Sequence, residues 1–250
     1  MKLAYLICVF VPHLIAEYFR WIRRMAKHPE RYPIELRFFK VKSLVSNLNK
    51  AMDNKIAYIN TTDMYKSDKK FIMFCNHQSM FDPLALILNA KRPIAFLAKK
   101  ESRNFIFVGK VAKIIGSEFL DRENLKSQVK VIMKIQRSLA NNEIDWGVFP
   151  EGTRQKDPSL DVLDFHSGTF KIPQKAHCDI YLTAIYGTFK ILQFLKFPKY
   201  GLTAGINVFK KVPYDDIKNV ETTELSVKMK DEINEKVKVL REEDQKLLVS

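Results

Sequence analysis

Short apolar runs alternate with helical stretches from residue 71 onward, and few folds accommodate such an alternation. The helical stretches include residues 123–142, which are long and charged and end in Asn-Asn. Strands that alternate with helices favour a mainly parallel sheet flanked by helices. We therefore expect an α/β fold with strands at FIMFC (71–75), IAFLA (94–98), WGVFP (146–150), IYLTAI (180–185) and GINVF (205–209).

Two polar segments directly follow two of the expected strands. NHQSMFD (76–82) comes after the run at 71–75, and EGTR (151–154) follows the run at 146–150. In a parallel sheet, ligands bind in the crevice beyond the carboxyl ends of the strands. The two segments are therefore predicted to meet at one edge of the sheet.

The first segment holds a histidine and an aspartate five residues apart. If the chain turns from strand into helix here, the carboxylate of Asp82 folds back onto the ring of His77. Such a carboxylate fixes the tautomer of the ring and supports its protonated form, so His77 can act as a general base on a hydroxyl. A structural alternative stays open, because Asp82 followed by Pro83 is also typical of a helix N-terminus and His77 then occupies an ordinary turn.

No nucleophile is evident beside this pair. The chain contains no Gly-x-Ser-x-Gly elbow. Ser79 lies only two residues from His77, in what we expect to be a tight turn, and is interpreted as structural. The attacking hydroxyl is therefore expected to come from the substrate, which indicates transfer to an alcohol rather than hydrolysis through an enzyme ester.

The second segment, FPEGTR (149–154), suits an anionic ligand. Arg154 can grip a phosphate or a carboxylate through its planar guanidinium, and Gly152 lets backbone N–H groups come close to an anion. Glu151 is expected either to bind a substrate hydroxyl or to hold Arg154 in place. The alternative is a surface turn with an incidental ion pair.

The chain is strongly basic, with 42 Lys and Arg against 28 Asp and Glu and a formal net charge of +14. This charge favours nucleic acid, anionic lipid or an anionic substrate as a partner. Zinc-finger spacing, an RNP-like strand and a basic zipper are all missing from the sequence. We therefore expect an anionic membrane surface as the partner and no nucleic acid.

The N-terminal segment also indicates a membrane. It is apolar from Leu3 to about Ala16, and residues 34–52 continue with a basic and aromatic helical pattern. We expect residues 1–55 to form a membrane-docking helix pair ahead of an α/β domain at 56–250. A short transmembrane helix and a signal sequence stay open as alternatives, although the apolar run is short for a span and lacks a small-residue cleavage site. The side chains expected in the headgroup layer are Tyr18, Phe19, Arg20, Trp21, Arg23 and Arg24.

The cysteines and histidines show no metal-ligand spacing. The three cysteines form no pairs at motif spacing, and the five histidines are scattered. This pattern fits buried thiols in a reducing compartment. We expect no metal site.

Together, the two polar segments resemble the first and third sequence blocks of the glycerolipid acyltransferase family, specifically the 1-acylglycerol-3-phosphate acyltransferases. AKKESRNFIFVGKVAKIIGSEFLDR (98–122) resembles the block between them, and residues 164–188 resemble the region after the third block. The likeness spans Phe71 to about Thr188. Two departures concern the last region: Leu182-Thr183 replaces a strand proline of the family, and FHSG replaces a more basic stretch.

The resemblance implies an α/β fold behind a membrane-docking helix pair, at the cytoplasmic face of the cell membrane. It implies transfer of a fatty acyl group from a thioester, carried by coenzyme A or acyl carrier protein, to the sn-2 hydroxyl of lysophosphatidic acid, giving phosphatidic acid. No metal or organic cofactor is implied. His77 matches the general base and Asp82 its orienter, and the residues that match the acceptor site are Lys100, Arg122, Glu151, Gly152, Thr153 and Arg154.

Two other functions are alternatives. An acyltransferase of the same fold can act on glycerol-3-phosphate, another lysophospholipid or a lyso-aminolipid. A basic membrane-binding protein can keep the fold without catalysis.

Overall fold

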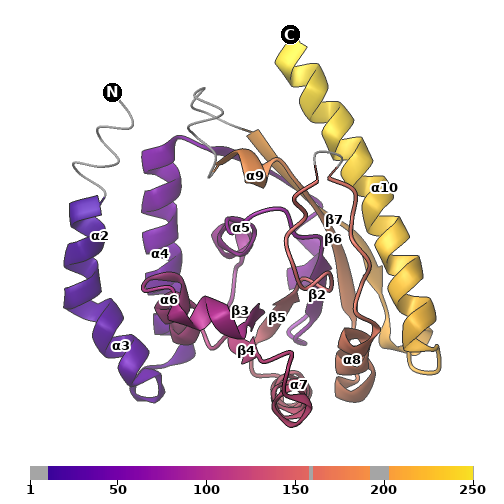
Figure 1. The fold of residues 1–250 in the computed structure, drawn as a ribbon, viewed down its shortest axis with the longest axis horizontal. Coiled ribbons are helices and arrows are strands. Elements are labelled where there is room, and N and C mark those ends of the chain that lie inside the picture. The colour runs from indigo at the N-terminus through magenta and orange to yellow at the C-terminus, as the bar shows by residue number, and fades with distance from the viewer. Residues whose placement is uncertain (1–10, 158–159, 192–202, 250) are drawn as a thin grey trace.

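The protein is described by a computed structural model that covers residues 11–157, 160–191 and 203–249 (Figure 1). Its helices are α2 (Val11–Glu17), α3 (Arg23–Lys27), α4 (Ile34–Met52), α5 (Asp82–Asn89), α6 (Val108–Ile114), α7 (Leu125–Ala140), α8 (Lys171–Ala176), α9 (Thr188–Ile191) and α10 (Thr222–Val249). Its strands are β1 (Lys55–Ile59), β2 (Ile72–Cys75), β3 (Ile94–Lys99), β4 (Glu118–Leu120), β5 (Asp145–Val148), β6 (Ile180–Tyr186) and β7 (Thr203–Val212).

The strands form one seven-stranded sheet in the order β1-β7-β6-β2-β5-β3-β4. Strands β6, β2, β5, β3 and β4 all pair in parallel. Strand β7 pairs antiparallel with β6, and β1 pairs parallel with β7, so these two run the other way. The expected mainly parallel sheet is thus confirmed.

Helices cover both faces of the sheet. Helices α4, α5 and α6 lie on one side and α7, α8 and α10 on the other (Figure 1). Both faces of strand β2 are buried, which explains its apolar sequence. Met73 and Cys75 join the core under the first group of helices, whereas Ile72 and Phe74 join the core under the second. A central parallel strand buries both faces and therefore needs a continuous apolar run.

All five expected strands are present, and the structure adds two. Strand β1 begins with an exposed lysine at the edge of the sheet, and β4 has only three residues, each half-buried. The apolar run of β4 is only two residues long, whereas β1 does contain a short apolar run, IAYI (56–59), and was not among the expected strands. The helix expected at 34–52 is α4, and the one expected at 123–142 contains α7.

The N-terminal helices pack against the α/β core. Phe38 and Val41 of α4 are fully buried in the same hydrophobic cluster as Met73 of β2. Trp21 was expected in a headgroup layer, and that expectation is wrong: its side chain is only 6% exposed, and its indole N–H donates to Glu17. The π-helical turn Tyr18–Ile22 places this ring on the side of the helix that faces the core.

None of the helices in the described part of the chain is long and apolar enough to cross a membrane. The first part of the apolar N-terminal run, up to residue 10, lies outside the described residues. The division into residues 1–55 and 56–250 stays a prediction.

Candidate active site

The residues singled out in the sequence lie at the carboxyl ends of neighbouring strands. His77 follows β2, Glu151 follows β5, Lys100 follows β3 and Arg122 follows β4, and these four strands are adjacent in the order β2-β5-β3-β4. The two polar segments do meet, as expected, because the backbone N–H of His77 donates to Oε1 of Glu151 at 2.5 Å.

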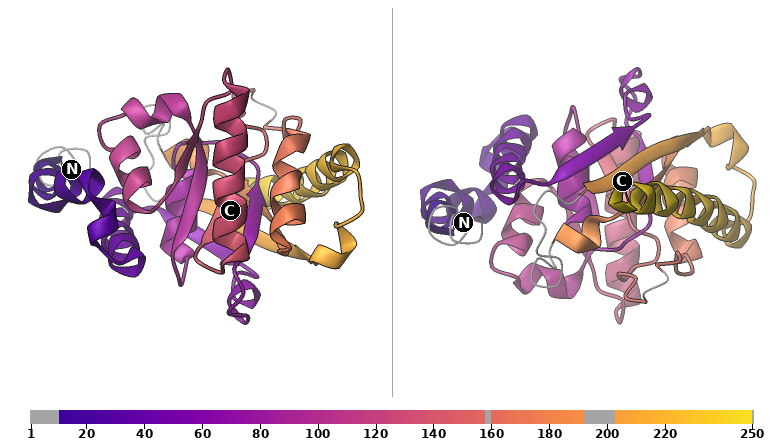
Figure 2. Two further views of the ribbon diagram at one scale, coloured as in Figure 1. Left: turned by 90° about the horizontal axis from the view of Figure 1, so that it is seen from below. Right: turned by 90° about the horizontal axis from the view of Figure 1, so that it is seen from above.

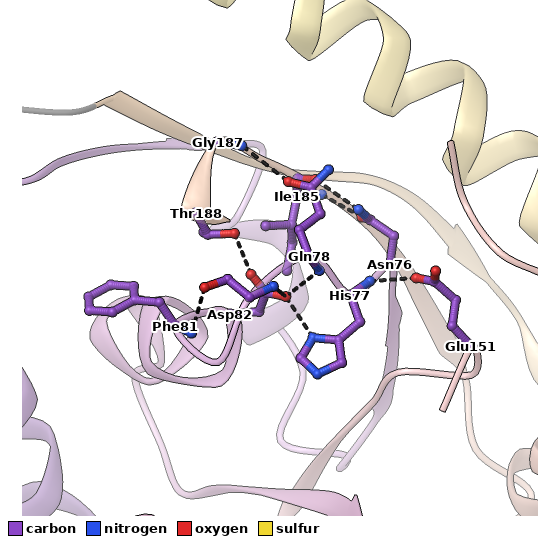
Figure 3. Close-up of polar contacts among 10 residues, drawn as sticks. Asn76, His77, Gln78, Phe81, Asp82, Glu151, Ile185, Gly187 and Thr188 are labelled. Carbon is purple, nitrogen blue, oxygen red and sulfur yellow. Dashed lines mark hydrogen bonds and ion pairs between the residues drawn. The ribbon is translucent and has the colours of Figure 1, made fainter. Parts of the chain in front are cut away.

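The His77 ring is held by Asp82. Nδ1 of His77 lies 2.7 Å from Oδ2 of Asp82, and the side chain of His77 is 18% exposed. Because an ionised carboxylate only accepts hydrogen bonds, Nδ1 carries the proton and Nε2 keeps its lone pair. Figure 3 shows Nε2 pointing away from Asp82. The ring also stacks on Phe149, with centroids 4.3 Å apart, so both its tautomer and its plane are set.

Asp82 is the centre of a buried hydrogen-bond network (Figure 3). Its side chain is fully buried, and Oδ2 also accepts the backbone N–H groups of Gln78 at 2.7 Å and Ser79 at 2.8 Å. Oδ1 accepts the hydroxyl of Thr188. Although α5 begins at Asp82, the N-cap position is Phe81, and the hydrogen bonds of the Asp82 carboxylate go to His77, Gln78, Ser79 and Thr188 rather than to the first turn of the helix. Its bonds go back to the loop that carries His77, so the helix-cap interpretation does not describe it.

Two amide side chains fasten this loop to β6. Asn76 donates to the carbonyl of Ile185 at 2.9 Å and accepts the N–H of the same residue at 2.8 Å. Oε1 of Gln78 accepts the N–H of Gly187 at 3.2 Å. Sequence reasoning missed these roles, and it also missed Thr188, which lies 106 residues from Asp82 along the chain. The one available signal was that Thr188 follows an expected strand at the same edge.

Glu151 is a buried bridge between backbone segments. It is 3% exposed, and its second oxygen accepts the N–H of Leu163 at 3.0 Å. The carbonyl of His77 in turn accepts the N–H of Gln155 at 2.8 Å. The segment after β5 therefore holds both backbone polar groups of His77. Burial raises the pKa of Glu151 to about 7, against the two backbone hydrogen bonds, which lower it.

Cationic side chains lie on the loops that follow the neighbouring strands β3, β4 and β5. The guanidinium of Arg122 donates to the carbonyl of Gly152. Gly152 has φ of +62°, a left-handed conformation that strains other residues, so the position favours glycine, and a side chain there would displace the Arg122 guanidinium. Lys100 pairs with Asp121 at 2.7 Å. Arg154 is exposed and has no ion pair with any residue in the described ranges.

Thr153 is exposed beside Arg154. His166 lies close to Gly152 on the same side as Arg122. Burial, together with the charge of Arg122, lowers the pKa of His166 and so favours its neutral form. The cations that can meet an anion therefore come from the loops after three adjacent strands, β3, β4 and β5.

We expect the Glu151→Gln substitution to change how stability depends on pH. Because the folded-state pKa of about 7 lies above the ordinary value of 4.5, the folded protein binds this proton more tightly than the unfolded chain does. The wild type should therefore lose roughly 2–3 kcal/mol of unfolding free energy relative to the variant between pH 5 and pH 8. Urea titrations of both proteins across this range measure the difference. A constant difference would contradict a desolvated Glu151 carboxylate.

Comparisons with known proteins agree with this site. The Acyltransferase family matches residues 55–186. A probable 1-acyl-sn-glycerol-3-phosphate acyltransferase of Mycoplasma genitalium is 30% identical over 197 residues, which cover 76% of this chain and 71% of the relative. A probable 1-acyl-sn-glycerol-3-phosphate acyltransferase of Mycoplasma pneumoniae is 33% identical over 165 residues, which cover 64% of this chain and 60% of the relative.

A solved structure supports the fold. The 1-acyl-sn-glycerophosphate (LPA) acyltransferase PlsC of Thermotoga maritima is similar with a TM-score of 0.63 at 19% identity, over 81% of this chain and 79% of that one. At this identity the likeness concerns the fold alone. The family match covers more than half of the chain and includes both polar segments, so the resemblance seen in the sequence is confirmed and this chain belongs to the Acyltransferase family.

Proposed function

We propose that the protein transfers a fatty acyl group from an acyl thioester to the sn-2 hydroxyl of lysophosphatidic acid, giving phosphatidic acid. The observation that carries this proposal is the His77–Asp82 pair, in which Nδ1 of His77 contacts Asp82 and Nε2 points away from it at the carboxyl end of β2. The curated relatives are named 1-acyl-sn-glycerol-3-phosphate acyltransferases, which supports the same acceptor. The thioester is already activated, so the reaction needs no metal or organic cofactor.

The chemistry follows from this arrangement. Nε2 of His77 takes the proton of the acceptor hydroxyl as the oxygen attacks the thioester carbonyl carbon. The tetrahedral intermediate collapses, the C–S bond breaks, and the thiolate leaves with the proton that His77 held. Asp82 stabilises the imidazolium between the two proton transfers. Glu151 is proposed to act by fixing the backbone of His77 rather than by touching the acceptor.

Arg122 and Arg154 are proposed to bind the acceptor phosphate, with Lys100 as a further cation. A phosphate held there places the neighbouring hydroxyl against His77 and converts binding into orientation. Gly152 supports this role because it leaves the space that the Arg122 guanidinium occupies.

Arg154→Ala is expected to raise the KM for lysophosphatidic acid by roughly tenfold or more and to leave the KM for the acyl donor unchanged, because a bidentate phosphate contact is lost. Arg154→Lys should restore only part of this, since an ammonium lacks the planar fork. Lys156→Ala, which removes an equally exposed charge two residues away, is the matched control. An unchanged acceptor KM in Arg154→Ala would place the phosphate at Arg122 or Lys100.

A single assay tests the function itself. The purified protein is given a radiolabelled acyl thioester with lysophosphatidic acid, glycerol-3-phosphate, other lysophospholipids or a lyso-aminolipid. Labelled phosphatidic acid as the main product is the expected result. Preferred use of another acceptor would favour the related acyltransferase, and vesicle binding without any transfer would favour a non-catalytic protein.

We further propose that the protein docks on the anionic, cytoplasmic face of the cell membrane through the side that carries α2, α4 and the turn at residues 105–107. Phe19, Phe105 and Ile106 are 66%, 54% and 65% exposed. The turn contacts the N-terminal helices directly, because the ring of Phe107 packs edge-on against Tyr18 at 5.4 Å. Exposed aromatic and apolar side chains with nearby cations are typical of interfacial docking.

Replacing Phe19 and Ile106 together by serine is expected to weaken binding to anionic vesicles by at least roughly tenfold, because two apolar side chains no longer enter the bilayer. Sedimentation with vesicles measures this. Leu125→Ser with Val129→Ser, on the opposite face of the sheet, removes two comparably exposed side chains and serves as the control. Equal losses in both variants would argue against this docking side. Deletion of residues 1–50 is a poorer test, since α4 contributes Phe38 and Val41 to the core.

A further inference from the structure

Helix α7 has an exposed apolar row that neither the proposed chemistry nor the proposed membrane contact uses. Leu125, Val129 and Met133 are 73%, 50% and 43% exposed. They recur every fourth residue and therefore lie on one side of the helix. The opposite side, with Ile135 and Leu139, is buried against the sheet.

A row of cations lies beside the apolar row. Lys126, Lys130 and Lys134 are exposed, and the 16 residues of α7 include no aspartate or glutamate. Lys134 pairs with Glu118 of β4. Lys126 and Lys130 form no ion pair with any residue for which side chains are described. This surface, defined by Leu125, Lys126, Val129, Lys130 and Met133, is called the α7 face, and it complements an acidic partner that has apolar side chains of its own.

The α7 face begins at the edge of the active site. Asn124, whose side chain caps α7, is two residues from Arg122. The side chain of Gln128 donates to the carbonyl of Arg122 at 2.7 Å, which ties the first turn of α7 to the loop that contacts Gly152. A partner on the first turns of α7 therefore lies next to Arg122 and Gly152, in the segment whose Glu151 accepts the backbone N–H of His77.

The position and composition of the α7 face favour a protein over a lipid surface. Helix α7 lies on the opposite side of the sheet from α4 and α5 (Figure 1), and seen from below it crosses the front of the molecule while the N-terminal helices lie at the far left (Figure 2). A flat bilayer that meets Phe19 and Phe105 does not also meet this side. The helix contains no aromatic residue, whereas interfacial helices commonly place Trp or Phe in the headgroup layer.

We infer that the α7 face docks an acidic carrier protein that delivers the acyl thioester to His77. This inference rests on the proposed acyl transfer and names the donor for it. The carrier approaches from the α7 side of the sheet, while the lysolipid comes from the membrane side. The two substrates then reach the same strand edge without competing for one surface.

The test compares two donors, a palmitoyl-loaded acyl carrier protein and palmitoyl-coenzyme A, with lysophosphatidic acid in vesicles as the acceptor. Reversing two charges with Lys126→Glu and Lys130→Glu should raise the KM for the carrier donor by roughly tenfold or more, because the complementary field is lost. The KM for palmitoyl-coenzyme A and the binding to vesicles should not change. Leu125→Ser with Val129→Ser should likewise affect only the carrier donor.

Lys55→Glu with Lys228→Glu is the matched control, because it makes the same change in net charge at exposed positions on β1 and α10. The inference would be overturned if the two double reversals raised the KM for the carrier donor equally, or if the α7 variant raised the KM for both donors equally. Loss of vesicle binding in the α7 variant would also overturn it. Titrating the protein directly with the loaded carrier tests the docking inference separately from the proposed acyl transfer. Carrier binding that the α7 variant weakens supports docking even if no acyl transfer occurs, and turnover of coenzyme A thioester without carrier binding overturns docking alone.

Discussion

Replacing His77 by alanine is expected to lower kcat by ~10²–10⁴-fold or more, because the proposed general base for the acceptor hydroxyl is removed. The fold should persist. Asp82 would keep its hydrogen bonds from Gln78, Ser79 and Thr188. Single-turnover assays with saturating substrates measure the chemical step, and circular dichroism and vesicle binding check the structure.

His28 provides the matched control for this substitution. Its ring is part-exposed in the loop before α4, where Nδ1 lies 3.3 Å from Oε1 of Glu30. His28→Ala should leave kcat unchanged. Turnover close to wild type in His77→Ala would rule out the mechanism, whatever the family of the chain.

Asp82→Asn is expected to reduce kcat by a comparable ~10²–10⁴-fold, because a neutral amide does not stabilise the imidazolium as a carboxylate does. The amide oxygen can still take the place of Oδ2, where it accepts the N–H groups of Gln78 and Ser79, and the amide nitrogen can donate to the Thr188 hydroxyl. The loop should therefore hold its shape, and KM should change much less than kcat.

Asp145→Asn separates a catalytic effect from a general cost of altering a buried carboxylate. Asp145 is 1% exposed, lies at the amino end of β5, and is bound by Arg92 at 2.6 and 2.9 Å. Its substitution should lower the free energy of unfolding without a specific loss in kcat. If Asp82→Asn also lowered only stability, Asp82 would be a structural residue.

The local part of the site follows from the sequence. His77 and Asp82 are five residues apart across a strand-to-helix turn, so their contact depends on the local path of the chain rather than on distant packing. Placement of both polar segments at one edge also follows, since strands that alternate with helices run parallel and bring their carboxyl ends together. For the same reason the central strands, which must be apolar on both faces, were recognisable.

The tertiary structure decided which distant groups reach this pair. Thr188 bonds Asp82, and Asn76 pairs with Ile185, because β6 lies beside β2. Alternation of strands and helices does not set that order of strands. Glu151 illustrates the same limit. Its position beside Arg154 in the sequence suggested a contact with the substrate or with Arg154. Its burial and its two backbone partners, however, result from the path of the chain after β5.

The N-terminal segment and α7 show why an amphipathic pattern alone is ambiguous. The pattern identifies helices, but which side is covered depends on what packs against each one. Packing against the core buried Trp21, which sequence composition had assigned to the headgroup layer, and it left Leu125 exposed at the edge of the site. Sequence by itself determined the elements and the local catalytic pair, because both depend on neighbours along the chain. The buried network and the two outer surfaces were decided by the tertiary structure, because they depend on contacts between segments tens of residues apart.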